Sequence, residues 1–230
     1  MRLISTMVTA IVLALAVSAA RADGLIHQLP ADGHWVRFDL KMVRQRGENE
    51  RIGTGTMQIS SVGQVKENGE PCRWIEFKMN TKKGEREDRI VAKVLIPEKH
   101  LQRGATPIDH LVRGWIKLGD RDTQALTATQ RGPLPVFLGG PLKDAKKLEA
   151  EVVDGKLGKL KCAGVTGRTA FKEGGDEATA DVTTRLNKKA PFGVVTCSMK
   201  YMGGGGQSGT LDLTLADVGT DAKTELPDAK

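Results

Sequence analysis

Aromatic residues, cysteines and histidines are all scarce in this sequence. Phe, Trp and Tyr together make up 4% of its 230 residues, and there are 3 Cys and 4 His. A chain of this length buries a sizeable core without a disulfide framework. No two histidines have the i, i+4 spacing of a helical zinc pair, and there is no G-x-S-x-G nucleophile elbow. We therefore predict no metal site and no catalytic residue.

One glycine-rich segment resembles a dinucleotide-binding motif in its letters. Gly204, Gly206 and Gly209 have the G-x-G-x-x-G spacing and follow a strand-like segment. A phosphate site of this kind needs a helix after the glycines. Residues Leu211 to Leu215 instead alternate with period two, which predicts a strand. The segment is interpreted as a hairpin loop, and no cofactor is predicted.

The three cysteines are Cys72, Cys162 and Cys197. An odd number is compatible with one disulfide and one free thiol. Cys162 and Cys197 both lie in strand-like segments and are a possible disulfide if those two strands are neighbours. The alternative is that the cysteines are buried, unpaired and small hydrophobic residues.

The N-terminus has the pattern of a secretory signal. Arg2 precedes an apolar run from Ile11 to Val17, and Ala20-Arg21-Ala22 has the small residues of a cleavage site. Residues 1–22 are thus a predicted signal peptide, and the mature chain is expected to be periplasmic or secreted. After cleavage no integral membrane segment is expected.

The net charge of +7 comes from basic residues that acidic residues interrupt along the chain. No basic stripe is interleaved with aromatic residues, as nucleic-acid binding would require. A nucleic-acid partner is therefore not predicted, and the charges are interpreted as a solvated surface.

Alternation of apolar and polar residues dominates the mature sequence. It predicts strands at His34–Val43, 52–60, 75–79 and 90–96, with Asn68-Gly69 as a hairpin turn between the second and third. Short turns join only antiparallel strands, so these four segments should form a meander. Similar alternation predicts a second group of strands at 148–153, 159–166, 178–186, 195–201 and 211–215.

The sequence pattern between the two groups of strands predicts helices. Thr106 and Pro107 suit a helix start, and Ile108, Leu111, Val112, Trp115 and Ile116 share one helical face up to Leu118. A second helix is expected at about 142–148. The fold class is mainly β (α+β), a curved antiparallel sheet or incomplete barrel of roughly nine strands with one or two covering helices. We expect one domain over 23–219, with a helical insert at about 106–150 and a polar, frayed tail over 220–230.

A curled sheet with an amphipathic helix over it is either a filled core or a container. The leading hypothesis is an apolar or amphipathic ligand, or the apolar segment of an envelope protein, as the partner. The predicted lining consists of alternating strand residues and one helix face. These residues are Val36, Phe38, Leu40, Met42, Ile75, Phe77, Met79, Leu111, Val112 and Trp115.

Two alternatives remain open. The first is a structural or interaction module of the cell envelope with a filled core, which would use Trp35 and Trp74 on the polar strand faces for contacts. The second is an enzyme, such as a hydrolase, for which no residue pattern argues.

The order of elements resembles that of the periplasmic lipoprotein-carrier (Lol-type) half-barrels and their relatives. The similarity runs from Trp35 to Leu215, and 73–77 (RWIEF) with 94–98 (VLIPE) resemble the long hairpin that such proteins place before a helix. The resemblance implies a curved antiparallel sheet, incompletely closed over a hydrophobic cavity that holds acyl chains. It carries over no catalytic or binding residue.

Overall fold

The hairpin turns predicted from the sequence organise the first half of the computed structural model. Asn68 and Gly69, with φ of 49° and 83°, form the turn in which Glu67 pairs with Glu70. Positive φ at both central residues is the geometry that Asn-Gly favours, because it matches the twist of the two strands. Gly84, with φ of 61°, helps to form the next turn, beside the Lys83–Arg86 pair. The predicted meander of four strands is confirmed.

The structure describes residues 24–102, 104–127, 134–139, 142–173, 176–203 and 207–226. The predicted signal peptide and the glycines at 204 and 206 lie outside these residues. The elements are β1 Trp35–Arg46, β2 Asn49–Glu67, β3 Glu70–Lys83, β4 Arg86–Pro97, η1 Glu98–His100, η2 Pro107–His110, β5 Arg113–Leu118, β6 Gln124–Ala125, α1 Leu134–Leu138, β7 Lys143–Gly155, β8 Gly158–Glu173, β9 Asp176–Leu186, β10 Val194–Met202 and β11 Gln207–Gly219.

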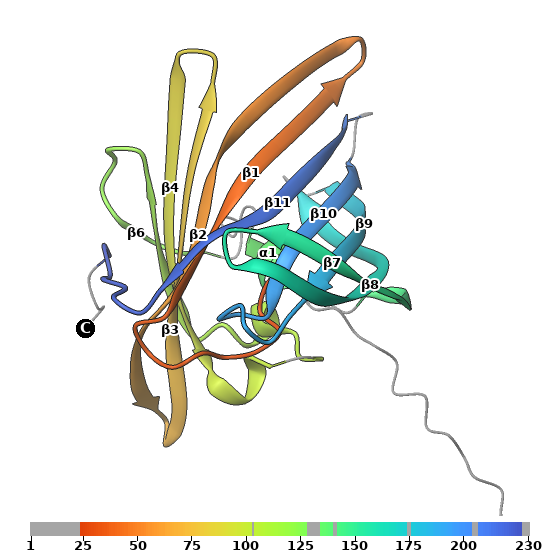
Figure 1. Ribbon diagram of the computed structural model, residues 1–230. Coiled ribbons are helices and arrows are strands. Elements are labelled where there is room, and N and C mark those ends of the chain that lie inside the picture. The colour runs from red at the N-terminus through yellow and green to blue at the C-terminus, as the bar shows by residue number, and fades with distance from the viewer. Residues whose placement is uncertain are drawn as a thin grey trace, which may run out of the picture.

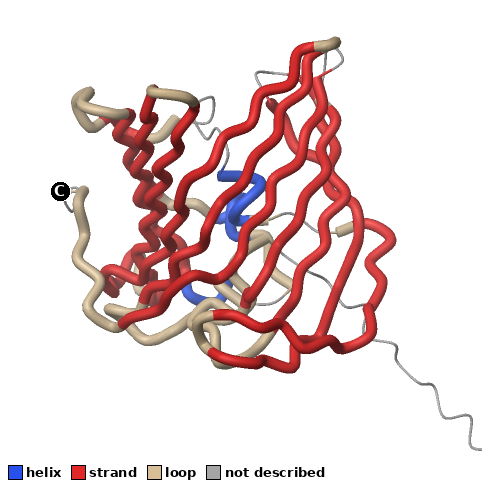
Figure 2. Tube along the Cα trace, turned by 45° about the horizontal axis from the view of Figure 1, so that its top comes forward, coloured by secondary structure: helices blue, strands red, loops and turns tan. Residues whose placement is uncertain are grey.

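One sheet contains both groups of strands. Its order is β6-β5-β4-β3-β2-β1-β11-β10-β9-β8-β7, with antiparallel pairing throughout. The pairing of β1 with β11 joins the first group to the last, with Phe38 opposite Leu215 and Leu40 opposite Leu213. The sheet curves and stays open between β6 and β7 (Figures 1 and 2). The prediction of an open, curved, antiparallel sheet is confirmed, but it has eleven strands rather than nine.

The predicted helix from Pro107 to Leu118 is wrong. Only Pro107–His110 is helical, as a short 3-10 turn, and Arg113–Leu118 is strand β5. Gly114 and the bulky or β-branched Trp115 and Ile116 favour a strand over a helix. Gly114 lies close to the backbone of β4, since a Cβ there would be 2.9 Å from the carbonyl oxygen of Lys93.

The second predicted helix, at about 142–148, is also wrong. These residues begin the long edge strand β7, which pairs with β8. The described α-helix is instead α1 at Leu134–Leu138, between the two segments for which helices were predicted. The covering helices predicted for the sheet are thus replaced by one short helix and two 3-10 turns. None of the described helices is long and apolar enough to cross a membrane.

The core lies on the concave face of the sheet. Alternate residues of the strands face inward and form one apolar cluster with α1 and the N-terminal residues Leu25 and Ile26. Figure 2 shows α1 within the curve of the sheet. A smaller cluster of Cys72, Trp74 and Leu95 lies on the outer face, with Trp115 packed against it. Part of the sheet therefore buries side chains on both faces.

Residues 221–226 of the C-terminal segment are held against the sheet. Residues 221–226 pass across the outer face of the first strands and form hydrogen bonds to the side chains of Trp35, Glu76 and Lys93. The expectation of a frayed tail is wrong for these residues. Leu226 is buried, which a solvated tail would not achieve.

Candidate ligand-binding site

Seven of the predicted lining residues lie together on the concave face. β1 and β3 place their inward side chains in the same apolar cluster because both alternate with period two and pair with β2. Met42 and Met79 are partly buried at its margin, and the other five are buried. The seven are Val36, Phe38, Leu40, Met42, Ile75, Phe77 and Met79.

Helix α1 covers part of this apolar wall. The ring of Phe137 stacks on that of Phe77, with centroids 6.4 Å apart and planes inclined by 20°. Leu134, Phe137 and Leu138 are all buried. The amide of Leu25 donates a hydrogen bond to the carbonyl oxygen of Phe137 at 2.8 Å, so the N-terminal segment holds the helix in place.

An apolar hollow of about 20 Å³ lies between α1 and strands β2 to β5. All its lining side chains are hydrophobic: Met57, Phe77, Met79, Ile90, Ala92, Ile116, Leu134 and Phe137. This space holds about one water molecule, and an apolar cavity of this kind stays dry. The wall is thus nearly filled by α1 in this conformation, with no polar group to fix a ligand's orientation.

Two of the three predicted helix residues lie away from this site. Leu111 packs against the concave cluster. Val112 is 42% exposed, and Trp115 contacts the outer cluster around Trp74. Because β5 is a strand, neighbouring side chains point to opposite faces, so Trp115 and Ile116 cannot share one face. The prediction that Trp115 lines the ligand-binding site is therefore wrong, and this residue lies on the outer face of the sheet.

Sequence reasoning missed most of the residues around the hollow. Ile90 and Ala92 belong to an alternating segment that was recognised but not assigned to the site, and Ile116 was placed on a helix. Met57 lies in the strand with the weakest pattern. Leu134 and Phe137 carry no periodic signal, because α1 is shorter than two helical turns.

The three cysteines are free and buried. Cys162 on β8 and Cys197 on β10 are separated by β9, so the condition on which the predicted disulfide rested is not met. Strands two apart lie roughly 9–10 Å from each other, beyond the reach of a disulfide. Burial raises the pKa of all three thiols, that of Cys197 to about 12 with a contribution from Asp212. At neutral pH these groups are thiols rather than nucleophilic thiolates.

His100 and His110 come from the two 3-10 turns and stack face to face. Their ring centroids are 3.4 Å apart and the ring planes are inclined by 4°. Burial, together with the charges of His110 and Lys99, lowers the pKa of His100. Within the described residues, His, Cys, Asp and Glu side chains form no group of three or more that suits a metal ion.

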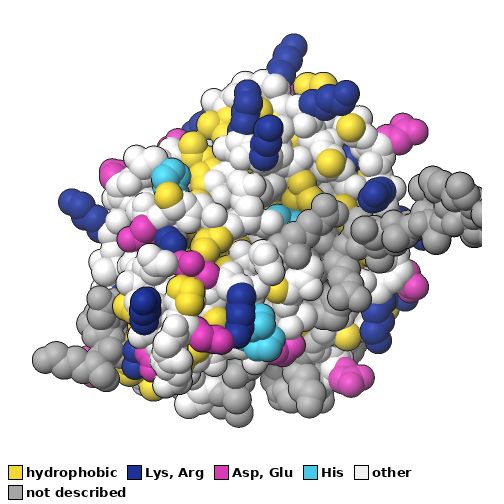
Figure 3. All heavy atoms as spheres, turned by 90° about the horizontal axis from the view of Figure 1, so that it is seen from below, with side chains coloured by type: hydrophobic (Ala, Val, Ile, Leu, Met, Phe, Trp, Pro, Cys, Tyr) yellow, Lys and Arg dark blue, Asp and Glu magenta, His cyan; other side chains and the backbone are white. Residues whose placement is uncertain are grey.

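One face of the molecule mixes charges of both signs. Seen from below, apolar side chains form small patches between basic, acidic and other residues (Figure 3). Strongly apolar side chains exposed elsewhere, such as Val152 at 61% and Met202 at 68%, lie on β7 and β10. The concave wall belongs to the larger of the two apolar clusters of the described residues.

Comparison with known proteins gives distant structural matches only. No family model matches the sequence, and no curated protein does. A DUF1329 family protein from Desulfovibrio piger aligns with a TM-score of 0.38 and 10% identity, over 85% of this chain and 88% of that one.

Two further structures align over most of their length. A candidate exported protein with a YmcC-like fold from Bacteroides fragilis gives a TM-score of 0.38 and 6% identity, over 84% of this chain and 99% of that one. A candidate outer membrane lipoprotein-sorting protein domain from Vibrio parahaemolyticus gives 0.31 and 8%, over 85% and 89%. TM-scores this low do not assign the chain to any of these folds.

Proposed function

We propose that this chain is an exported envelope protein that binds the acyl chain of a lipid, or a similar apolar ligand, between the concave face and α1. The observation that carries the proposal is the hollow beneath α1, whose lining side chains are all hydrophobic. An apolar hollow between strands β2 to β5 and their covering helix is a starting point for a ligand that moves this helix outward.

The ligand would enter by moving α1 outward, because the hollow beneath the helix is too small to hold an acyl chain. A helix of five residues is not stable alone, so its position depends on burying Leu134, Phe137 and Leu138. An acyl chain offers the same kind of apolar surface, at about 25 cal/mol per Å² removed from water. Met57 and Met79 line the hollow, and their flexible side chains adapt to chains of different shape.

Export and the element order agree with this proposal. The predicted signal peptide would deliver the chain to the envelope, where lipids and lipoproteins are available. The resemblance to Lol-type carriers implies an acyl-chain cavity on the same face of the sheet. We therefore propose that this chain is a distant relative of the Lol-type carriers.

A displacement assay with a fluorescent fatty acid tests the proposal. Ala92→Ile fills the hollow and should weaken fatty-acid binding by roughly tenfold or more, because it removes space that the ligand needs. The matched control is Ala163→Ile, in which the side chain is exposed on β8. Absence of saturable binding to the wild-type chain, or equal effects of the two substitutions, would contradict the proposal.

The small volume of the hollow favours a second candidate function. With about 20 Å³ free, the concave core is nearly full, as in an interaction module of the envelope. Trp74 is buried in the outer cluster, which leaves Trp35 as the better candidate for contacts. A wild-type chain that binds no fatty acid and captures an envelope protein, with loss of capture in Trp35→Ala, would support this alternative.

A further inference from the structure

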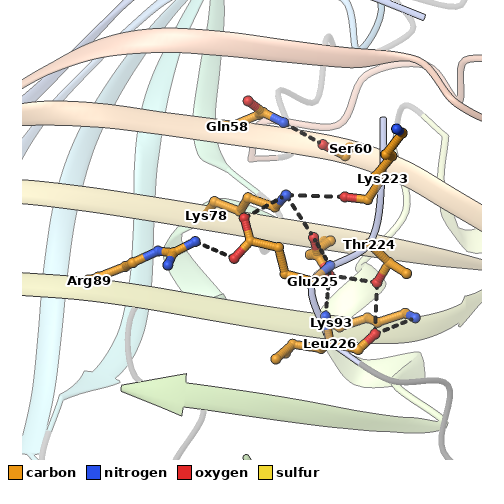
Figure 4. Close-up of polar contacts among 10 residues, drawn as sticks. Gln58, Ser60, Lys78, Arg89, Lys93, Lys223, Thr224, Glu225 and Leu226 are labelled. Carbon is orange, nitrogen blue, oxygen red and sulfur yellow. Dashed lines mark hydrogen bonds and ion pairs between the residues drawn. The ribbon is translucent and has the colours of Figure 1, made fainter. Parts of the chain in front are cut away.

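The C-terminal segment occupies a defined polar site on the outer face of the sheet, on the opposite face of β3 and β4 from the hollow. The indole nitrogen of Trp35 donates to Asp221 at 2.8 Å, and the amide of Ala222 donates to the carbonyl oxygen of Gly33 at 2.9 Å. The segment then crosses from β1 towards β4 (Figures 1 and 4). We call the side chains of Trp35, Glu76, Lys78, Arg89 and Lys93 the outer strip.

Two fully buried charges form the centre of the outer strip. Glu76 on β3 and Lys93 on β4 are directly opposite each other, and both are 0% exposed. The carboxylate of Glu76 accepts hydrogen bonds from the amides of Glu225 at 3.0 Å and Leu226 at 3.2 Å. Lys93 donates to the carbonyl oxygen of Leu226 at 3.1 Å (Figure 4).

Further contacts fix the segment on either side of this centre. Lys78 donates to the carbonyl oxygen of Lys223 at 3.2 Å and forms an ion pair with Glu225 at 3.0 Å. Arg89 forms an ion pair with Glu225, and the hydroxyl of Thr224 donates to Glu76 at 2.8 Å. Most of these bonds go to the main chain, so the strip recognises an extended backbone as well as the side chains of Thr224, Glu225 and Leu226.

A buried charge is stable only where hydrogen bonds replace its water. The covering chain provides these bonds for Glu76 and Lys93 through its amides and carbonyl group. The segment follows directly after β11, which ends at Gly219.

We propose that the outer strip is a peptide-binding site that holds the chain's own C-terminal segment and also accepts the same segment of a second copy. Exchange of identical segments between two copies preserves every contact. Whether the segment binds its own chain or the second copy therefore depends only on the link after β11 and on the protein concentration. The site is distinct from the concave wall and does not depend on the lipid-binding proposal.

Fluorescence anisotropy with a labelled synthetic peptide of residues 220–226, amidated at its end, tests the site. The host is the full-length chain with Leu226→Asp, which loosens the resident segment. We expect saturable binding to this host that is at least about tenfold tighter than to the wild-type chain, whose own segment competes at an effective concentration in the millimolar range.

Two further variants of this host test the buried centre. Adding Glu76→Gln should weaken peptide binding by at least about tenfold, because the backbone amides of the peptide would then bond to a neutral carbonyl oxygen instead of a carboxylate. Adding Glu151→Gln, which disrupts an ion pair with Arg185 on the far side of the sheet, should leave binding unchanged. If the Leu226→Asp chain loses its β-sheet circular dichroism, Thr224→Ala takes its place as host.

The second copy is tested with the wild-type chain. Sedimentation should show dimers that increase with protein concentration and that excess peptide returns to monomers. A folded host that binds no peptide at millimolar concentration, or that binds it regardless of Glu76→Gln, would overturn the site. Peptide binding together with a wild-type chain that stays monomeric would overturn the exchange.

Discussion

Gly24 connects the N-terminal segment to the helix that covers the apolar wall. Its φ is +59°, and an added Cβ would overlap the carbonyl oxygen of Phe137 and the backbone at Gly139. The same carbonyl oxygen accepts the hydrogen bond from Leu25. Only a glycine combines this backbone conformation with so close an approach to α1.

Gly24→Ala should therefore destabilise the chain more than an alanine at a glycine with the same conformation. Gly47 also has φ of +59° but nothing within 4 Å of the added Cβ. We expect Gly47→Ala to lower the free energy of unfolding by about 1 kcal/mol from the left-handed conformation. Gly24→Ala should cost roughly 2 kcal/mol more, since the overlap shifts α1. Urea unfolding measures both, and equal losses would show that α1 is not held at this position.

The stacked pair of His100 and His110 makes stability depend on pH. Burial lowers the pKa of His100 in the folded chain, as do the charges of His110 and Lys99, and Glu70 opposes them. The unfolded chain then binds a proton more readily below about pH 6.5. Stability is complete above that pH and decreases as the pH falls towards the folded pKa of His100.

Urea midpoints at pH 5.5 and 7.5 measure this effect. The wild-type chain should unfold at a lower urea concentration at pH 5.5, and His100→Gln should reduce the difference between the two midpoints, because it removes the titrating group. An unchanged difference in His100→Gln would assign the pH dependence to other groups.

At the scale of the elements, the sequence predicted strands best where one face of the sheet is wet. In β1, Phe38 and Leu40 face the core and Asp39 and Lys41 do not, so period two is clear. In β5, Ile116 faces the core while Trp115 packs on the outer cluster. Burial on both faces removes the alternation, and the remaining spacing of apolar residues imitates a helix.

The other wrong helix shows how pairing overrides local preference. Residues 142–148 include Leu, Lys and Ala, which are good helix formers, yet they form the start of β7 along β8. A helix this short has little stability of its own, whereas the strand is stabilised by its hydrogen bonds to an existing sheet. Both errors concern segments whose structure is decided by contacts distant in sequence.

The edge strand β7 should be the least protected part of the long sheet. It pairs with β8 on one side only, and most of its residues are exposed. β1 pairs with both β2 and β11. Amide hydrogen exchange in β7 should be at least about tenfold faster than in β1, because edge amides open without breaking the core. The amides of β11 should exchange as slowly as those of β1. Equal exchange rates in β7 and β1 would contradict the assignment of β7 as an edge strand.

For the whole molecule, the sequence predicted the class of fold and the inner face of the first strands, but not how the parts join. No local pattern indicates that β1 pairs with β11, since their paired residues are far apart in the sequence. One feature of the sequence could have indicated the outer strip. Lys93 lies between Val91 and Leu95, two buried apolar residues on the outer face of β4. That pattern indicates a face that another segment covers.

The predicted lining residues of β1 and β3 share the concave face, but the element that covers them was predicted wrongly. The seven residues of β1 and β3 follow from alternation alone. Phe137 and Leu134 approach them only because the sheet curves around α1, and curvature depends on the whole set of strands.

The central claim is that an acyl chain binds between the concave face and α1, and methionine methyl groups report on it directly. Met57 and Met79 line the hollow, whereas Met202 is 68% exposed on β10. The measurement is an NMR spectrum of the protein with ¹³C-labelled methionine methyl groups, in the presence of stearic acid that carries a nitroxide near its methyl end. The reference spectrum is recorded after ascorbate has reduced the nitroxide. The account predicts that the nitroxide broadens the signals of Met57 and Met79 and spares that of Met202. Unbroadened Met57 and Met79 at saturating ligand, or equal broadening of Met202, would contradict it.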